Sequence, residues 1–290
     1  MDWKTDWSLR LRMLFTMGLL GILYLVFIGV LAANGVGFVG ITVVMGLFML
    51  GQYFYSDKIA LYGAGATKVE REEAPELHEM VDRLSQQADV PKPDVAVIDS
   101  KVPNAFATGR SPKHSTVAVT TGLMNTLDSD EINGVLAHEL SHVKNRDVAV
   151  MTIASFISTL AFMVVRWSPF MAMGRDNRQN GGGIMVALVA SVVVWIVSTL
   201  LLRALSRYRE FAADRGAARI TGSPSALASA LMKIDGRMDR VPERDLRQEE
   251  SSMNAFYIIP VKTGIISRLL STHPPTEKRI ERLRELESQM

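Results

Sequence analysis

The sequence predicts an α+β membrane protein, with four transmembrane helices and a polar part in which helices surround a small antiparallel sheet. The first observation is a long stretch between Arg12 and Asp57 that contains no charged residue. The second is a pair of further apolar runs, at residues 148–165 and 184–202. The third is a set of short β-branched segments between residues 57 and 147, which are typical of strands.

Two apolar runs, residues 14–33 and 36–55, make up the amino-terminal stretch, with Asn34 and Gly35 between them. At about 1.5 Å of rise per residue, each run can cross a hydrocarbon core of about 30 Å as a helix. A signal peptide at residues 1–33 is the alternative, but the first run is longer than a signal core and a second run follows at once. The sequence therefore favours an uncleaved transmembrane hairpin over residues 1–56. Aromatic residues typical of membrane interfaces flank it, namely Trp3, Trp7, Tyr53, Phe54 and Tyr55.

A second transmembrane hairpin is expected over residues 148–203. Its first run, 148–165, is close to the lower length limit for a span, so a pair of buried core helices is an alternative. The second run, 184–202, is rich in Val and Ile, which also leaves a buried strand open. Residues 168–183 contain three consecutive glycines and are expected to form a flexible loop.

The positions of Lys and Arg predict the orientation in the membrane, because cytoplasmic loops carry an excess of them. Positive residues flank both ends of the first hairpin and follow the fourth run, whereas the turn at Asn34 carries none. Arg175 and Arg178 in the second loop argue against this orientation, but the first hairpin is the clearer case. We expect a multi-pass protein of a prokaryotic inner membrane, with the polar part in the cytoplasm. The positive residues are Lys4, Arg10, Arg12, Lys58, Lys68, Arg203, Arg207 and Arg209.

Overall charge and cysteine content exclude several classes. Lys and Arg number 32 against 30 Asp and Glu, so the formal net charge is +2. Domains that bind nucleic acid are usually strongly basic, so no nucleic-acid partner is expected. The chain contains no Cys, which excludes disulfides and a thiolate nucleophile. Any metal site must therefore use His, Asp or Glu.

The polar part is expected in two segments, residues 57–147 and 204–290, one after each hairpin. Helical spacing predicts a helix at 74–88, and alternation or β-branching predicts three antiparallel strands. Asp128 or Ser129 can cap a further helix, with an acidic residue about three positions later as in a capping box. The expected strands are 94–99, 104–108 and 115–121, and a last helix is expected at 276–288.

That capped helix carries the sequence His138-Glu139-Leu140-Ser141-His142. Residues at positions i and i+4 project from the same face of a helix, so the two imidazoles can bind one zinc ion. Glu139 is rotated by about 100° from His138, where it can take a proton from water without binding the metal. The alternative is that this motif occurs by chance, but its position within a capped helix makes a metal site the better interpretation.

A catalytic zinc needs a third protein ligand and one open position. Glu210 and Asp214 lie one turn apart on a helix with two alanines between them, which allows another helix to approach. Such a pair is often a solvated helix face, but the two histidines lack a third ligand, so Glu210 is the leading candidate. Asp214 would orient an imidazole by accepting its free N–H. The two hairpin runs between His142 and Glu210 would return the chain to the same side of the membrane.

These paired motifs resemble the M48 zinc metallopeptidases, over nearly the whole chain. The amino-terminal hairpin makes the HtpX-like membrane proteases a better match than the CAAX-processing proteases, which have more helices. The resemblance implies a zincin-like catalytic domain, with Glu139 as general base and Glu210 as third ligand of one Zn²⁺ per chain. It also implies that Asn104, Ala105, Phe106 and Ala107 form an edge strand that binds the substrate backbone.

The resemblance further implies that His273 stabilises the oxyanion and that Arg279 helps to hold the site. From the residues alone, His273-Pro274-Pro275 would read equally well as a cap before the last helix. The resulting hypothesis is a membrane-bound zinc-dependent endopeptidase that acts on polypeptides at the cytoplasmic face, in quality control of misfolded or damaged membrane proteins. The alternatives are a scaffold with structural zinc, a non-peptidase zinc hydrolase and, least favoured, a transporter, since the apolar runs contain no Asp, Glu, Lys, Arg or His.

Overall fold

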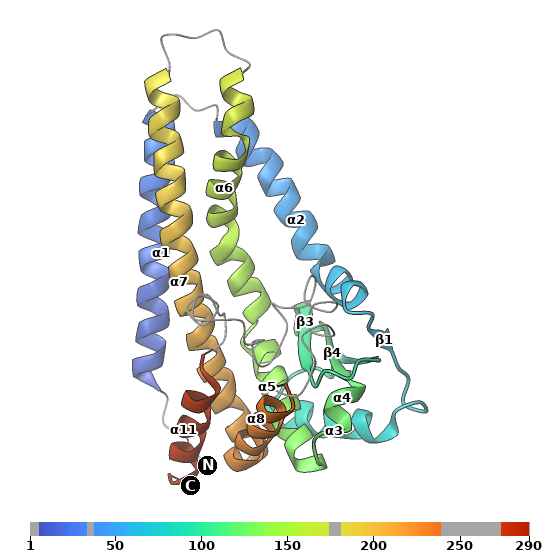
Figure 1. Cartoon of the computed structure of the whole chain (residues 1–290). Helices are drawn as coiled ribbons and strands as arrows, with labels where there is room; N and C mark the ends of the chain where they lie inside the picture. The colour runs from blue at the N-terminus through green and yellow to red at the C-terminus, as the bar shows by residue number, and fades with distance from the viewer. Residues whose placement is uncertain (1–5, 34–37, 174–180, 239–273, 290) are drawn as a thin grey trace. The chain divides into compact units, whose positions relative to one another are not determined.

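The computed structural model describes residues 6–33, 38–173, 181–238 and 274–289 (Figure 1). It divides into two compact units, each built from separate stretches of the chain. One unit contains Phe54–Ala149 and Ser206–Met290 together with Met1–Lys4. The other contains Thr5–Tyr53 and Val150–Leu205. The boundaries predicted between the hairpins and the polar segments, at residues 56, 147 and 203, stay a prediction.

The apolar unit is helical, with parts of α1 (Trp7–Ala33), α2 (Phe38–Gly63), α6 (Asp147–Met173) and α7 (Gly181–Thr221). Its core joins large residues of α1 to alanines of α6 and to Ala187, Val194 and Leu205 of α7. The hydroxyl of Tyr24 donates to the backbone oxygen of Ala154, 2.6 Å away. Many large apolar side chains point outward, as expected of helices that face lipid. They include Leu14, Phe15, Ile22, Leu25, Val189, Val193 and Leu200.

Two of the described helices are long and apolar enough to cross a membrane. These are Trp7–Leu31, with a mean hydropathy of 2.5, and Met185–Thr221, with 2.6. A bent pair, Ser129–Lys144 with Asp147–Met163, would be a third. Residues 184–202 are helical, which excludes the strand alternative. Of the expected loop at 168–183, residues 168–173 belong to α6 and residues 181–183 to α7, whereas residues 174–180 lie outside the described part of the chain. Four spanning helices stay a prediction.

The polar unit contains a four-stranded sheet in the order β1-β2-β4-β3. The prediction of an antiparallel sheet was wrong, because β2 and β4 run parallel. The chain reverses twice, once between β2 and β3 and once in the β3–β4 hairpin, so β4 regains the direction of β2 and pairs with it. Among the described strands, this leaves β3 at one edge of the sheet and β1 at the other. The strands are β1 (Thr67–Lys68), β2 (Asp94–Ile98), β3 (Ala105–Ser111) and β4 (His114–Thr120).

Helices pack around this sheet and enclose its core. The helix α5 (Ser129–Lys144) contacts β3, β4, α3 and α8, so it lies at the centre of the unit. Its start is fixed by the predicted capping box, in which Asp128 accepts from the amide of Glu131 and Glu131 accepts from that of Asp128. The other helices are α3 (Pro75–Ala88), α4 (Thr121–Met124), α8 (Pro224–Met238) and α11 (Thr276–Glu287), and fully buried residues include Val117, Ala118, Val135, Leu136 and Leu140.

Candidate metal centre

The two histidines of α5 turn toward each other, as their spacing predicts. Their Nε2 atoms lie 3.1 Å apart, and the rings meet edge to face. The His138 side chain is 1% exposed, whereas that of His142 is 17% exposed. One imidazole is therefore enclosed by protein, and the other lies at the edge of the site.

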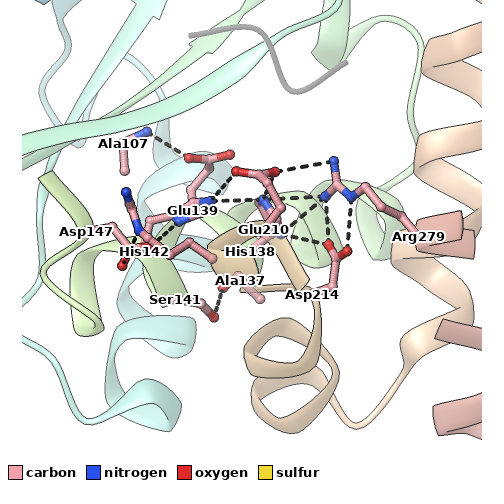
Figure 2. A network of polar contacts seen from close by, with 11 residues as sticks. Ala107, Ala137, His138, Glu139, Ser141, His142, Asp147, Glu210, Asp214 and Arg279 are labelled. Carbon is pink, nitrogen blue, oxygen red and sulfur yellow. Dashed lines mark hydrogen bonds and ion pairs between the residues drawn. The ribbon is translucent and has the colours of Figure 1, made fainter. Parts of the chain in front are cut away.

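The helix α7 brings Glu210 to the same point. Its Oε2 lies 3.6 Å from Nε2 of His138, and its Oε1 lies 3.5 Å from Nε2 of His142 (Figure 2). All three candidate ligand atoms lie within 4.8 Å of one another. The structure thus brings together the two histidines and the leading carboxylate, although Glu210 lies 68 positions after His142 in the chain.

The surroundings of the histidines fit a metal ion, since each Nδ1 atom faces a carboxylate. Nδ1 of His138 lies 3.0 Å from Asp214, and Nδ1 of His142 lies 2.5 Å from Asp147. A neutral imidazole with its proton on Nδ1 presents the Nε2 lone pair to a metal. Two imidazole nitrogens and one carboxylate oxygen form a donor set typical of catalytic zinc.

The electrostatics of the site also favour a cation at Nε2. Burial lowers the pKa of His138, but the hydrogen-bonded carboxylates of Asp214 and Glu210 outweigh it and raise that pKa to about 9. The same carboxylates would stabilise a metal ion in place of the proton. Asp214 contacts the Nδ1 atom of His138, on the opposite side of the ring from the Nε2 atom that would bind the metal. This position does not suit Asp214 as the fourth ligand of a structural zinc site.

Arg279 of α11 holds Asp214 and also lies against His138, with Nη2 3.4 and 3.5 Å from the two ring nitrogens. Its Nε and Nη2 atoms lie 3.0 and 2.7 Å from the two carboxylate oxygens, and Nη1 lies 3.6 Å from Glu210. Burial lowers the pKa of the guanidinium, but Asp214 outweighs burial and raises it, so Arg279 stays charged. The structure therefore places Arg279 beside the centre. His273 lies outside the described residues, as do residues 239–252 of the charged segment.

Glu139 faces the edge strand. Its Oε2 accepts a hydrogen bond of 2.9 Å from the backbone amide of Ala107, and its side chain is buried. The amide of Thr120 donates to the oxygen of Asn104, so residues 104, 106 and 108 turn their backbone groups toward β4. Those of Ala105 and Ala107 point away from β4, and there the amide of Ala107 meets Glu139. The side chains of Asn104 and Phe106 are buried.

A small hollow of about 20 Å³ lies at the end of β3 beside His142. Ala107, Arg110, Arg146 and Asp147 contribute to its walls.

The remaining described histidines lie apart from this centre. Nε2 of His78 lies 2.9 Å from the backbone oxygen of Val69, and Nδ1 of His114 lies 3.0 Å from Ser111. Asp147, in contrast, belongs to the centre and was missed by sequence reasoning. It stands five positions after His142, which is not a position on the same face of a continuous helix.

The fold and the centre define a metallopeptidase: a helix-borne histidine pair, a glutamate between them, a carboxylate from a second helix and an adjacent edge strand. The model of Peptidase family M48 matches residues 71–287, and the chain belongs to this family. The protease HtpX homolog 2 of Methanosarcina acetivorans is 56% identical over 99% of this chain and 98% of its own. The protease HtpX homolog of Moorella thermoacetica is 52% identical, over 99% and 97%.

A solved structure shares the fold at much lower identity. The crystal structure of S. mikatae Ste24p matches with a TM-score of 0.57 and 18% identity, over 91% of this chain and 62% of that chain. The family match and the two relatives, rather than this structure, show that the chain is an HtpX-like member of the M48 metallopeptidases, a membrane-associated protease whose substrates are polypeptides.

Proposed function

We propose that this chain is a zinc-dependent endopeptidase in which His138, His142 and Glu210 bind one Zn²⁺ ion. The observation that supports this most strongly is the approach of their three ligand atoms to within 4.8 Å of one another. When bound, zinc would polarise the scissile carbonyl and lower the pKa of water, which is the chemistry that peptide hydrolysis requires.

Glu139 is the proposed general base. Its Oε2 is held by the amide of Ala107, which fixes the carboxylate next to the histidines and leaves Oε1 to take the proton of the attacking water. Glu139 would then deliver that proton to the leaving amine. His273 is proposed to stabilise the oxyanion, with Arg279 and Asp214 fixing His138 in the orientation that exposes its Nε2 atom.

The substrate is proposed to bind as an added strand along β3. The outward backbone groups of Ala105 and the outward carbonyl of Ala107 provide the hydrogen-bonding edge that strand addition needs, whereas the amide of Ala107 is donated to Glu139. The buried side chains of Asn104 and Phe106 would support the strand from behind. A polypeptide bound there would pass directly over Glu139.

We further propose that four helices cross a prokaryotic inner membrane and that the active site faces the cytoplasm. The charge-free runs, the outward apolar side chains of α1 and α7 and the flanking Lys and Arg residues support this orientation. A protease anchored in this way meets membrane proteins first, so clearance of misfolded or damaged membrane proteins is the proposed role.

The test is metal analysis and casein cleavage by the full chain in detergent, for the wild type, Glu139→Gln and Glu210→Ala. The wild type should carry about one zinc per chain and cleave casein. Glu139→Gln should keep the zinc and lose proteolysis, because only the base is removed. Glu210→Ala should lose both.

Zinc-free wild-type protein, purified without chelators and unable to take up zinc, would refute the metal centre. Cleavage by Glu139→Gln at a rate close to the wild type would refute the assignment of the base. Orientation can be checked independently, since a reporter fused after residue 290 should remain inaccessible from the outside of intact cells.

A further inference from the structure

Asp147 connects the candidate ligand His142 to Arg209 of α7. Its carboxylate is buried, with Oδ2 2.5 Å from Nδ1 of His142 and Oδ1 2.9 Å from Nε of Arg209. The contact with Arg209 is an ion pair without the alignment of a hydrogen bond. Neither residue belongs to the motifs that the sequence reveals.

A break in the helix places Asp147 at this point. In a continuous helix, a residue five positions after His142 would be rotated by about 140° from it and would point elsewhere. Here α5 ends at Lys144, Arg146 has a φ of 53°, and α6 begins at Asp147. A left-handed arginine costs about 1 kcal/mol or more, so other interactions must favour this conformation. The bond between Asp147 and His142 is one such interaction.

Arg209, the ion-pair partner of Asp147, directly precedes Glu210 in the sequence. Arg209 is buried, although a buried arginine is unfavourable unless it is paired. The consecutive residues Arg209 and Glu210 therefore serve both sides of His142, one through Asp147 and the other at its Nε2 atom. His138 has an equivalent arrangement, in which Arg279 holds Asp214 against its Nδ1 atom.

We propose that Asp147, held by Arg209, is a positioning residue that fixes the tautomer and ring orientation of His142 for metal binding. The proposal rests on the metal centre described above. Because His142 is the more exposed of the two histidines, its ring has less protein around it to hold its orientation. Without an acceptor for the Nδ1 proton, the imidazole could rotate or carry its proton on Nε2, and zinc would bind less tightly.

The test is the zinc affinity of the full chain in detergent, measured by competition with a chromophoric chelator. Asp147→Ala should bind zinc about 10–100-fold more weakly than the wild type, the loss typical of residues that orient metal ligands. Asp147→Asn should recover part of this loss, because its amide oxygen can still accept from Nδ1. Replacement of both partners, Asp147→Leu with Arg209→Met, removes the acceptor without leaving a buried charge, and it should weaken zinc binding as Asp147→Ala does.

A matched control separates this role from general stabilisation. Glu131 is also buried and forms an ion pair of 2.6 Å with Lys233, about two turns of α5 before His138. The double variant Glu131→Leu/Lys233→Met should lower the melting temperature of the metal-free protein without changing its zinc affinity. Equal losses of zinc affinity in the two double variants would overturn the proposal.

Zinc binding by Asp147→Leu/Arg209→Met within about twofold of the wild type would also overturn it, since positioning residues cost more than that. The variant Glu210→Ala distinguishes this result from a failure of the metal centre itself. If the wild type binds zinc and Glu210→Ala does not, the centre stands and only the role of Asp147 is rejected.

Discussion

Gly216 of α7 lies directly against Ser141 of α5. A Cβ atom built on Gly216 would be 2.3 Å from the hydroxyl oxygen of Ser141 and 2.7 Å from its Cβ. Ser141 cannot easily turn away, because its hydroxyl donates to the backbone oxygen of Ala137 at 2.8 Å and its Cβ is fixed by the helix (Figure 2). This contact sets the separation of the helix with the two histidines from the helix with Glu210.

Gly216→Ala should therefore destabilise the protein by about 1–3 kcal/mol, as overpacking of a tight interface does. It should also weaken zinc binding, because the separation of α5 and α7 sets the distance from Glu210 to the histidines. Thermal unfolding and chelator competition would measure the two effects.

The exchange Gly216→Ala/Ser141→Gly restores the space and should recover zinc affinity, despite the low helix propensity of the new glycine. Gly236→Ala in α8 is the control, since no atom lies within 4 Å of the added Cβ. It should be neutral or stabilise by up to about 1 kcal/mol, as alanine does in a helix. Unchanged stability and zinc affinity in Gly216→Ala would contradict the proposed role of the contact.

The local elements were predictable because their signals are local. The capping box at Asp128, the helix at Pro75–Ala88 and the β3–β4 hairpin depend on residues a few positions apart, and the structure contains all three. The parallel pairing of β2 with β4 was not predictable in this way. The pairing depends on which strands are neighbours in the sheet, and the alternation of apolar residues within a strand does not determine its neighbours.

The residues of the site likewise divide into those that local sequence patterns predict and those that they do not. His138 and His142 follow from helical spacing, and Glu210 followed from the need for a third ligand. Asp147 did not, because its position depends on the left-handed conformation of Arg146, a non-glycine residue that gives no sequence signal. Arg279 was singled out only through a family resemblance, since a buried arginine in a charged helix resembles its exposed neighbours.

Arg279→Met should be among the most destabilising substitutions in the polar unit. It would leave the carboxylate of Asp214 buried without its bidentate partner, which typically costs about 3–5 kcal/mol. Arg279→Lys keeps the charge but not the two parallel hydrogen bonds, so its stability should be intermediate between those of Arg279→Met and the wild type. The control is Arg284→Met, an exposed position of the same helix, which should change the melting temperature little. Equal melting temperatures for the two methionine variants would refute this account.

Removal of the metal should lower stability as well as activity, because the proposed ion joins α5 to α7. Zinc at one hundred times its dissociation constant would add about 2.7 kcal/mol to the free energy of unfolding. The melting temperature should therefore fall on chelation and recover when zinc is added. Glu139→Gln should show the same shift as the wild type, since Glu139 is not a proposed ligand, whereas Glu210→Ala should show little or none. A full shift in Glu210→Ala would argue against Glu210 as a ligand.

Ala107→Pro tests the contact between β3 and the proposed base. The amide of Ala107 points to the free edge and donates to Glu139, so proline removes this hydrogen bond without removing one from the pairing with β4. Misplacement of a catalytic group by about 1 Å can cost about 100-fold in rate, so kcat should fall about 10- to 100-fold while zinc content is unchanged. Ala107→Ser retains the amide and is the matched control, with cleavage close to the wild type. Normal kcat in Ala107→Pro would mean that Glu139 needs no support from the edge strand, and loss of zinc in the same variant would mean that the strand supports the metal ligands instead.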